Sequence, residues 1–463
     1  MTNQMSNIPT KIYRENTKEI AIIGGGLAGL TAAVYLARDG KNVTVIEKSS
    51  KAGGRARTTI KDKFYFNQGP HALYANGIGP KVLDELNIKY TGKKVDSTKY
   101  YITKKGKLYK LPTKLNEILT TKLLNGWGSK VEVLHFFIKL NKMKLDQLYS
   151  LSFQEWLDLN FKNPDSKDFV KMLGRIATYT YNAENLSARL ALYQVKTAVT
   201  GSVVYLDEGW QTLIDQLVEI GKRNGVKYVH GKGVVTLQQD YAHDKKNPQQ
   251  IWKISLSDNT TLSYHNVIIA TNPFHVYSLL KDNKKVNSEF LKQLENINRP
   301  ARVATLDLAL SSLPNPDVYG VYGMDTPLYI SLHSAFAKLS TDGNGVLFHA
   351  MKYLDSSIGP NPLEDKLQLE SLLDTIQPGW RKMIIRQRFL PSMIASNTVI
   401  NYNNNETMEN RPDTEVPGVN NLYIIGDWVG PDGMLADASF ASAKAVALSI
   451  LNNRKAIEMH TIQ

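Results

Sequence analysis

The stretch Glu19-Ile-Ala-Ile-Ile-Gly-Gly-Gly-Leu-Ala-Gly-Leu30 decides the fold class of this chain. Its apolar run, residues 19–23, predicts a buried parallel strand. A glycine-rich turn follows at once, and residues 31–38 (TAAVYLAR) predict a helix. Residues 42–47 (NVTVIE) predict a second strand that ends in an acid. A G-x-G-x-x-G turn between the strand and the helix of a βαβ unit is typical of a Rossmann-type dinucleotide-binding domain.

The residues of the turn have separate physical roles. Gly24 permits the tight turn, Gly26 lets the backbone approach a pyrophosphate, and Gly29 lets the helix pack close to the strand. The N-terminus of the predicted helix offers free N–H groups and a positive dipole end to the phosphates, and Leu27 and Ala28 lie within the glycine-rich turn that leads to it. We therefore place all five residues in the predicted cofactor site.

The acid at the end of the second strand indicates which nucleotide is bound. Glu47 can accept hydrogen bonds from a ribose diol, whereas a basic residue at this position would suit a 2′-phosphate. Glu47 thus argues against NADP. Lys48 follows directly and is placed in the same predicted site. A glycine-rich turn without a ligand is the alternative interpretation of the whole unit.

The segment Lys51-Ala-Gly-Gly-Arg-Ala-Arg-Thr58 comes next. It resembles the G-G-R motif of the flavin amine oxidase superfamily, which includes protoporphyrinogen oxidases, phytoene desaturases and monoamine oxidases. The resemblance implies FAD as the cofactor, with Gly54 close to it and Arg55 balancing pyrophosphate charge. The chain has no cysteine, so a cysteinyl flavin link is excluded and non-covalent binding is expected.

Later segments resemble the same superfamily, so the likeness covers most of the chain. Residues 211–223 predict an amphipathic helix, and residues 226–229 and 233–236 predict short strands. In the superfamily a valine of this region touches the adenine end through its backbone. The resemblance assigns that role to Val235, with Val234 as an equal candidate and a plain hairpin valine as the alternative.

Two further motifs resemble the family pattern. Residues 265–273 (HNVIIATNP) resemble a strand followed by an A-T pair, which places Ala270 and Thr271 beside the cofactor. Residues 421–428 (NLYIIGDW) resemble the second flavin motif. There the resemblance implies that Gly426 and Asp427 bind the ribityl hydroxyls or the adjoining phosphate.

A long helix is predicted over residues 436–451, directly after Met434 and Leu435. The resemblance implies that its N-terminus points at the pyrimidine ring of the flavin. A positive helix end there would stabilise negative charge on the reduced ring. We therefore include both residues in the predicted site. A surface aspartate that caps a helix is the alternative for the Gly-Asp motif.

Asn67-Gln-Gly-Pro-His71 follows a predicted strand over residues 64–66. It resembles the loop that passes under the isoalloxazine ring, which places Gly69, Pro70 and His71 near the flavin. His71 is a weak candidate for a base or a covalent anchor; the competing interpretation is a hydrogen-bonded loop histidine. No other residue stands out as a catalytic group.

The remaining sequence predicts a second domain. A hairpin is expected over residues 100–111, helices over 113–124, 130–148, 152–160, 166–180 and 363–376, and strands over 303–310, 328–332, 345–353 and 383–390. The predicted fold class is α/β: a Rossmann-type FAD-binding domain with an interleaved α+β substrate domain, a mixed sheet with a helical cap. The FAD-binding domain is expected to comprise residues 1–91, 201–300 and 394–463, and the substrate domain residues 92–200 and 301–393.

Seven residues are candidates for lining a substrate cavity, although each is more often a core or loop residue. They are Tyr179, Tyr181, Tyr193, His333, His349, Tyr353 and Trp428. We find no G-x-S-x-G elbow, H-E-x-x-H, P-loop or Cys/His cluster, so no metal is expected and the chemistry should rest on the flavin.

The composition constrains the partners. The net charge is +13, but the lysines are spread out and no nucleic-acid motif accompanies them, so no nucleic-acid partner is expected. Residues 131–145 are apolar and basic and suit either a buried cap helix or peripheral contact with a membrane. No signal peptide is evident near the N-terminus and no transmembrane run is found. We expect a cytoplasmic protein, with the inner membrane face as an alternative; the oligomeric state stays open.

The predicted function is an FAD-dependent oxidoreductase that removes a hydride or two hydrogens from a C–C or C–N bond of a small, lipophilic or amine substrate. Oxygen or a quinone is the expected electron acceptor. Three different functions stay open beside it: a flavin-dependent isomerase or saturase of a polyene or lipid, a binding protein that retains FAD without catalysis, and an NAD-dependent dehydrogenase.

Overall fold

The computed structural model describes residues 19–148, 150–241, 250–399 and 411–460. The prediction about a signal peptide concerns residues 1–18, which lie outside the described residues. The glycine-rich stretch is at the centre of a five-stranded parallel sheet with the order β10-β2-β1-β14-β20. The strands are β1 Glu19–Ile23, β2 Asn42–Glu47, β10 Lys227–His230, β14 Asn266–Ile269 and β20 Leu422–Ile424.

Alternate side chains of this sheet enter two cores. Ile20 and Ile22 pack with α1 (Leu27–Arg38) and α12 (Leu435–His460), whereas Ala21 and Ile23 pack on the opposite face. That face is covered by a β-meander and two helices, and α8 packs beside α1. The covering elements are β11 Val234–Tyr241, β12 Gln250–Leu256, β13 Thr261–Tyr264, α9 Pro273–Leu280 and α10 Ser288–Asn296, and α8 is Gln211–Arg223.

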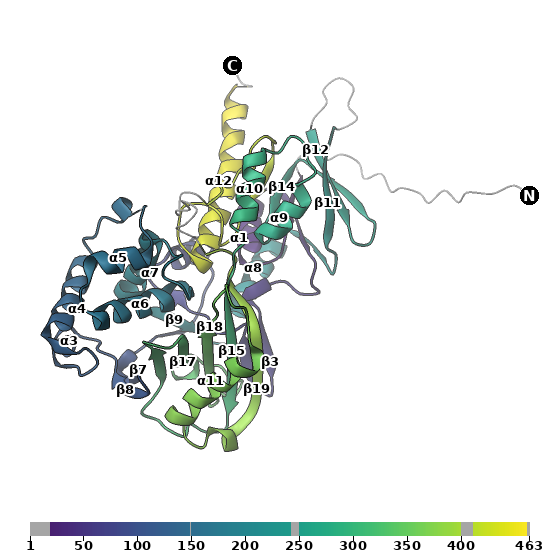
Figure 1. Cartoon of the computed structure of the whole chain (residues 1–463). Coiled ribbons are helices and arrows are strands. Elements are labelled where there is room, and N and C mark those ends of the chain that lie inside the picture. Colours follow the sequence, from purple (N-terminus) through teal and green to yellow (C-terminus); the bar gives the residue numbers. More distant parts are fainter. Residues whose placement is uncertain (1–18, 149, 242–249, 400–410, 461–463) are drawn as a thin grey trace, which may run out of the picture.

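The second half of the molecule is built on a seven-stranded mixed sheet with the order β19-β15-β18-β17-β16-β7-β8. Its strands are β7 Tyr100–Lys104, β8 Lys107–Lys110, β15 Ala301–Leu310, β16 Gly320–Gly323, β17 Leu328–Leu332, β18 Val346–Tyr353 and β19 Ile384–Ser396. Leu306 and Leu308 of β15 pack with Leu369 and Leu373 of α11 (Pro362–Ile376). The other face of the sheet is therefore free to meet the nucleotide-binding half and the helices (Figure 1).

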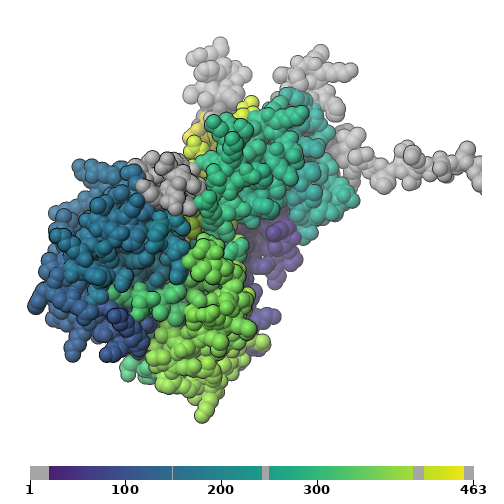
Figure 2. Space-filling view, in the orientation of Figure 1, coloured from purple at the N-terminus to yellow at the C-terminus, as the bar shows by residue number. Residues whose placement is uncertain are grey.

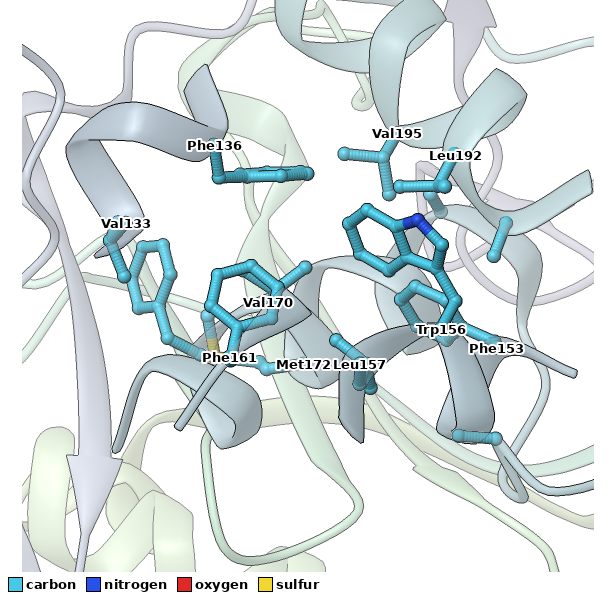
Figure 3. Packing of buried hydrophobic residues seen from close by; sticks show 14 of the residues in the cluster. Val133, Phe136, Phe153, Trp156, Leu157, Phe161, Val170, Met172, Leu192 and Val195 are labelled. Carbon is cyan, nitrogen blue, oxygen red and sulfur yellow. The ribbon is translucent and has the colours of Figure 1, made fainter. Parts of the chain in front are cut away.

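Five helices form the cap: α3 Leu115–Thr120, α4 Gly126–Leu140, α5 Phe153–Asn160, α6 Pro164–Thr178 and α7 Ala188–Gly201. Figure 3 shows the aromatic core that holds them together. Trp156 stacks on Phe153 with 6.1 Å between ring centroids and meets Phe136 and Phe161 edge-on. Figure 2 shows this blue region in contact with the green sheet region.

Shorter elements connect the two halves. They are α2 Ile78–Glu85, β3 Thr58–Lys61, β4 Phe64–Asn67, β5 Leu73–Tyr74, β6 Gly92–Lys94 and β9 Val203–Leu206, with short 3-10 turns at Gly54–Ala56, Ser97–Lys99, Leu145–Leu148, His333–Ala335 and Trp380–Met383. Strands β5, β9 and β6 form one small sheet, and β3 and β4 form another. The chain thus crosses several times between the Rossmann-type half and the half with the mixed sheet and helical cap.

The predicted fold class is confirmed, with local corrections. The helix predicted over residues 130–148 is wrong in its bounds, because α4 begins at Gly126 and ends before Asn141, a weak helix former in a polar run. The helix predicted over residues 113–124 shrinks to Leu115–Thr120. Helix α7 and strand β16 were not predicted. Helix α6 ends where Tyr179 adopts a left-handed conformation, with φ of 60°.

No helix within the described ranges combines the length and the apolar character that crossing a bilayer requires.

Candidate active site

The glycine-rich turn has the geometry that its sequence predicts. Gly24 has φ of 114°, and its N–H donates to the carbonyl of Ile46 at 2.8 Å. A Cβ on Gly29 would lie 2.0 Å from the carbonyl oxygen of Gly24, so only glycine lets α1 begin this close to the strand. At Gly26, by contrast, a Cβ would meet no protein atom within 4 Å. The space beside Gly26 and the first turn of α1, with Leu27 and Ala28, is open to an incoming group.

Glu47 lies at the carboxyl end of β2 and fixes the turn. Its two carboxylate oxygens accept hydrogen bonds from the N–H of Gly25 at 2.7 Å and of Ser49 at 2.8 Å. A carboxylate has about four lone-pair positions, so two bonds leave it able to accept from a ribose. Lys48 follows at the rim, with its Cβ 3.8 Å from the position of a Cβ on Gly233.

The G-G-R segment crosses directly over the glycine-rich turn. The N–H of Gly53 donates to the carbonyl of Gly25 at 2.8 Å, and Gly53 forms an isolated β-bridge with Gly26. Gly54 has φ of 53°, and a Cβ there would lie 3.5 Å from the Cα of Gly26. The two glycine segments, separate in the sequence, thus form the two sides of one backbone cradle.

Arg55 and Asp427 join the two predicted flavin motifs. The Arg55 guanidinium donates to both carboxylate oxygens of Asp427, at 2.8 and 2.9 Å. Asn397 donates to the same carboxylate from its backbone N–H at 3.0 Å and its side chain at 2.8 Å. Burial by itself would raise the pKa of Asp427, but the Arg55 charge and these hydrogen bonds hold that pKa below its ordinary value. Gly426, with φ of 152°, makes the turn that presents Asp427.

The A-T pair packs beneath the glycine-rich turn. A Cβ on Gly24 would lie 2.6 Å from the carbonyl oxygen of Ala270 and 3.3 Å from Thr271. Trp428, a candidate for the substrate cavity, is buried instead in the nucleotide half, where its indole N–H donates to the carbonyl of Thr271 at 2.9 Å. Ala270 and Thr271 therefore pack against the glycine-rich turn and support its conformation.

Val235 lies at an irregularity of the β11–β12 ladder. Val234 pairs with Leu256 and Thr236 pairs with Ser255, so the register skips Val235. The side chain of Val234 is buried, whereas Val235 is 59% exposed. A backbone that the ladder does not use is available to a ligand, and this favours Val235 over Val234 for an adenine contact.

The loop over residues 67–71 lies between the two halves. Gly69 has φ of 72°, and a Cβ there would lie 2.6 Å from Met393 and 3.2 Å from Thr305, both on the large sheet. After Pro70, the His71 ring nitrogens lie 3.1 Å from the carbonyl of Gly69 and 3.0 Å from that of Arg55. Burial lowers the pKa of His71 to about 4. A neutral ring carries one N–H, so one of these two contacts has no proton.

The start of α12 completes the nucleotide side. Met434 is buried against the helical cap. Its carbonyl accepts a hydrogen bond from the N–H of Ala438 at 3.3 Å, and helix α12 begins at the next residue, Leu435. Leu435 itself has φ of 54°. Asp437 lies in the first turn and accepts a bond at 2.7 Å from the N–H of Gly79 in α2. An acid in the first turn of a helix interacts favourably with the helix dipole.

A row of polar side chains crosses the large sheet on the face that meets the loop. Asp307 pairs in register with Arg388 on one side and with His349 on the other. His349 Nδ1 lies 2.6 Å from one oxygen of the buried Asp307, and the Arg388 Nε donates to the other oxygen at 2.9 Å. The pKa of Asp307 is lowered despite its burial, by the His349 and Arg388 contacts. An ionised Asp307 makes His349 Nδ1 the donor, and His349 Nε2 has no partner among the described residues.

The row continues into a cluster of tyrosines. Ser331 lies opposite His349 and bonds to the hydroxyls of Tyr100 at 2.7 Å and Tyr205 at 3.0 Å. Tyr205 stacks on His333 with 3.6 Å between ring centroids, and the rings of His333 and His349 are 4.4 Å apart. The candidates His333 and His349 are thus brought together within one buried network.

Three other candidates meet at the edge of this network. Tyr353 of β18 and Tyr179 lie with ring centroids 6.3 Å apart, and both pack in one cluster with Tyr181. Met393 belongs to the same cluster and also touches Gly69. We call the packed side chains of Val303, Tyr353, Tyr179, Tyr181 and Met393 the tyrosine cluster. Through Met393 this cluster lies next to the predicted flavin loop. Tyr193 lies elsewhere, on α7, where burial and then the charges of Asp437 and Asp432 raise its pKa.

Several functional-site residues were not anticipated from the sequence. Asn397 supports Asp427, and the buried Arg411 donates to the carbonyls of Asp427 and Gly433. Burial lowers the pKa of Arg411 to about 10. Asp307 was detectable, because an acid alternating with leucines in a predicted strand must face away from their core. We find no comparable signal for Asn397.

The residues fit a dinucleotide with a flavin. The cradle beside Gly26 would accept a pyrophosphate, and Glu47 would accept hydrogen bonds from a ribose. Among the residues that the structure describes, no group of three or more His, Cys, Asp or Glu side chains is arranged to hold a metal ion. Fold and site together define the class of FAD-dependent oxidoreductases.

The chain belongs to the family described as flavin containing amine oxidoreductase, which matches residues 27–301. It is similar to the mitochondrial protoporphyrinogen oxidase of Nicotiana tabacum, at 30% identity over 135 residues, which are 29% of this chain and 27% of that enzyme. It is also similar to the coproporphyrinogen III oxidase of Bacillus subtilis, at 28% identity over 149 residues, 29% of this chain and 32% of that enzyme. The matched segment thus spans about a third or less of these relatives.

An oxidoreductase from Methanosarcina mazei shares the fold, with a TM-score of 0.72 at 16% identity over 92% of this chain and 99% of that one.

Proposed function

We propose that this protein is an FAD-dependent oxidoreductase that removes a hydride or two hydrogens from a C–C or C–N bond of a small molecule. One observation carries the proposal: Gly69 of the predicted flavin loop lies so close to the sheet that bears the buried Asp307–His349 pair that a Cβ on it would be 2.6 Å from Met393 and 3.2 Å from Thr305. The predicted ring site and the candidate substrate site are therefore immediate neighbours.

The nucleotide side binds through backbone and charge. We assign Gly24, Gly26 and Gly29 with the start of α1 to the pyrophosphate, and Glu47 to the ribose. Arg55, held by Asp427, supplies positive charge next to the pyrophosphate. When bound, FAD would supply the two-electron acceptor for the reaction.

The same assignment continues to the cofactor ends, as proposals for the remaining predicted residues. Val235 would meet the adenine, with Lys48 at the rim. Gly54, Ala270 and Thr271 shape the cradle. Gly426 would present Asp427 to the sugar-phosphate chain. Met434 and Leu435 would set the start of α12 near the flavin, beside Pro70 and His71.

The substrate side excludes water and offers one proton acceptor. His349 is fully buried and its Nδ1 contacts Asp307, so in the neutral ring Nε2 would present an oriented lone pair, and it has no partner among the described residues. We propose that His349 Nε2 accepts a proton from the substrate, as an oriented imidazole does in general-base catalysis. His71 is less suited to this role, because both its nitrogens face backbone carbonyls.

A spectrum tests the central proposal. Purified protein should show the visible bands of oxidised flavin, and acid precipitation should release the chromophore, since the engaged ring nitrogens of His71 argue for a non-covalent link. Amines, polyenes and porphyrinogens should then be screened anaerobically for bleaching. A colourless protein that stays colourless after FAD is added would contradict the proposal and favour an NAD-dependent dehydrogenase or a role without a cofactor.

Turnover distinguishes an oxidoreductase from an isomerase and from a binding protein. An oxidase or dehydrogenase consumes oxygen or a quinone in proportion to product, whereas an isomerase or saturase forms product without a net acceptor. A binding protein that retains FAD would bind ligands that never bleach it. The electron acceptor is proposed to be oxygen or a quinone.

A separate observation favours peripheral membrane contact. Helix α4 lies at the outer edge of the molecule (Figure 1), and its Trp127, Val131 and Ile138 are 70%, 55% and 57% exposed. These positions share one helix face, and the ammonium of Lys130 lies 5.5 Å from the Trp127 ring. Apolar side chains flanked by lysines suit the headgroup region of an anionic bilayer.

The contact is tested by sedimentation with vesicles of anionic and of neutral phospholipid. We expect binding to anionic vesicles that W127A/I138A weakens. Equal pelleting of the wild type and the variant would remove the proposal.

A further inference from the structure

The guanidinium of Arg175 is buried and has no carboxylate partner. Arg175 lies on α6 and is 8% exposed. Its Nη2 donates to the carbonyls of Gly323 and Thr326, the latter at 2.9 Å, and its Nε is buried without a partner. None of the ion pairs among the described residues includes Arg175. A buried charge of this kind is costly unless something pairs with it.

The nearby acids do not fill that role. Asp168 and Asp325 favour the charged form of Arg175, but both are exposed and neither forms an ion pair with it. Burial lowers the pKa of Arg175, and the charges of Asp168 and Asp325 oppose that shift. Arg175 is therefore a buried guanidinium whose Nε can still donate a hydrogen bond.

Tyr353 is the second donor at this place. The Arg175 guanidinium carbon lies 5.7 Å from the centre of the Tyr353 ring, and the Tyr353 hydroxyl is fully buried without a partner. The two side chains come from different elements, α6 and β18. Two groups without a hydrogen-bond partner, the Arg175 Nε and the Tyr353 hydroxyl, thus belong to side chains that contact each other.

The tyrosine cluster lies between the Arg175–Tyr353 pair and the predicted flavin loop. Tyr353 pairs in register with Val303, and both pack in one cluster with Met393, which touches Gly69 of the flavin loop. Two residues of the tyrosine cluster, Tyr179 and Tyr181, also line a surface pocket, together with Arg302. The surface pocket therefore shares two of its lining tyrosines with the cluster that contains Tyr353.

We propose that Arg175 and Tyr353 form an anion subsite that binds a carboxylate of the substrate. The inference rests on the proposed function and narrows it, because it assigns the substrate to carboxylate-bearing molecules. A carboxylate oxygen would accept from Arg175 Nε and from the Tyr353 hydroxyl, and the charge would neutralise the buried guanidinium. A substrate ammonium group at this place would be repelled.

Three probes of similar shape test the subsite in the flavin-containing protein: benzoate, neutral benzamide and cationic benzylamine. Binding is followed by the perturbation of flavin absorption and, independently, by the shift of the thermal unfolding midpoint. Benzoate should bind, and benzamide and benzylamine should bind at least about 10-fold more weakly, since a charge-assisted hydrogen bond is lost.

The variants separate binding from structure. R175M should weaken benzoate binding on the order of 10- to 100-fold, and R175K by less, because lysine keeps the charge without the fork. Y353F removes an unpartnered hydroxyl, so it should fold normally and bind benzoate several-fold more weakly. R381M is the matched control: Arg381 also lies over an aromatic ring, 4.5 Å from the centre of Trp380, but at the surface.

The outcomes are decisive in either direction. Benzoate and benzamide of equal affinity, benzylamine binding more tightly than benzoate, or benzoate affinity unchanged in Y353F would overturn the proposal, even if R175M failed to fold. Failure of the proposed function can be distinguished from failure of the subsite. Benzoate binding can still be measured by the thermal shift in a protein that lacks flavin or whose flavin no substrate reduces.

Discussion

The guanidinium of Arg55 and the carboxylate of Asp427 form a two-bond ion pair across 372 residues of sequence. The Asp427 side chain is 2% exposed, and the Arg55 side chain is 41% exposed. The pair links the loop after β2 to the turn after β20, so it holds together the two segments to which we assign the flavin.

Breaking this pair should cost both stability and cofactor. R55M leaves a buried carboxylate with only Asn397 and Ser396 as partners, and we expect a loss of about 2 kcal/mol, less than for a fully buried pair because Arg55 is partly in solvent. D427N should act in the same direction. Denaturant unfolding and the flavin-to-protein absorbance ratio measure the two effects. R386M, which removes an exposed pair with Asp62, is the control and should change neither.

Alanine at two glycines should separate folding from cofactor binding. At Gly26 a Cβ meets no protein atom within 4 Å, and the backbone has φ of −81°, so G26A should fold within about 1 kcal/mol of the wild type. Its methyl group would nevertheless occupy the predicted path of the pyrophosphate. FAD affinity, followed by fluorescence quenching on titration into apoprotein, should fall at least about 10-fold.

Gly29 provides the opposite result. A Cβ there would lie 2.0 Å from the carbonyl of Gly24, which the backbone cannot relieve without moving α1. G29A should therefore lower the free energy of unfolding by about 2–3 kcal/mol or more. If G26A lost stability and G29A did not, the packing that we describe at the turn would be incorrect.

The Asp307–His349 pair should be energetically coupled. D307N leaves Arg388 without its acid and removes the charge that orients His349, and we expect a loss of about 3 kcal/mol. A double-mutant cycle with H349Q should give a coupling free energy above about 1 kcal/mol, because the two side chains share one hydrogen bond in the interior. Additive losses would mean that the pair does not act as a unit.

His71 should make stability depend on acid pH. Its pKa is lowered by burial to about 4, below the value near 6.5 of an unfolded chain, so the unfolded chain binds more protons between these values. Stability should be fully present above about pH 6.5 and fall as the pH drops toward about 4, by at most about 1.4 kcal/mol per pH unit. The free energy of unfolding, measured with urea at several pH values in this range, should depend less steeply on pH in H71Q than in the wild type. The same pH dependence in both proteins would show that His71 is not the group responsible.

Local elements were predictable because their signals are local. The bounds of β1, β2 and α8 agree with the residues predicted from the sequence, since an apolar run, a glycine-rich turn and an amphipathic period depend on neighbours a few residues away. The end of α6 at Tyr179 was missed, because its left-handed conformation depends on packing and tyrosine gives no turn signal.

The candidate site divides in the same way. The turn geometry at Gly24 and Gly29 was predictable from spacing alone, because it depends on the backbone of one βαβ unit, and the cofactor roles of Gly26 and Glu47 stay predictions. Arg55 and Asp427 were each found in a motif, but their pairing was not, because the order of strands in the sheet brings β20 beside β14 and so to the carboxyl edge of β1.

The amino-acid sequence was sufficient for the class of fold, the nucleotide-binding turn and the family. Tertiary structure alone decided that Asp307 orients His349, that His333 joins them, and that Arg175 lies over Tyr353 without a carboxylate. These relationships join β15 to β18 and α6 to β18. The physical reason is that a side chain's partner across a sheet or between a helix and a sheet is set by topology and register, and no pattern of neighbouring residues records either.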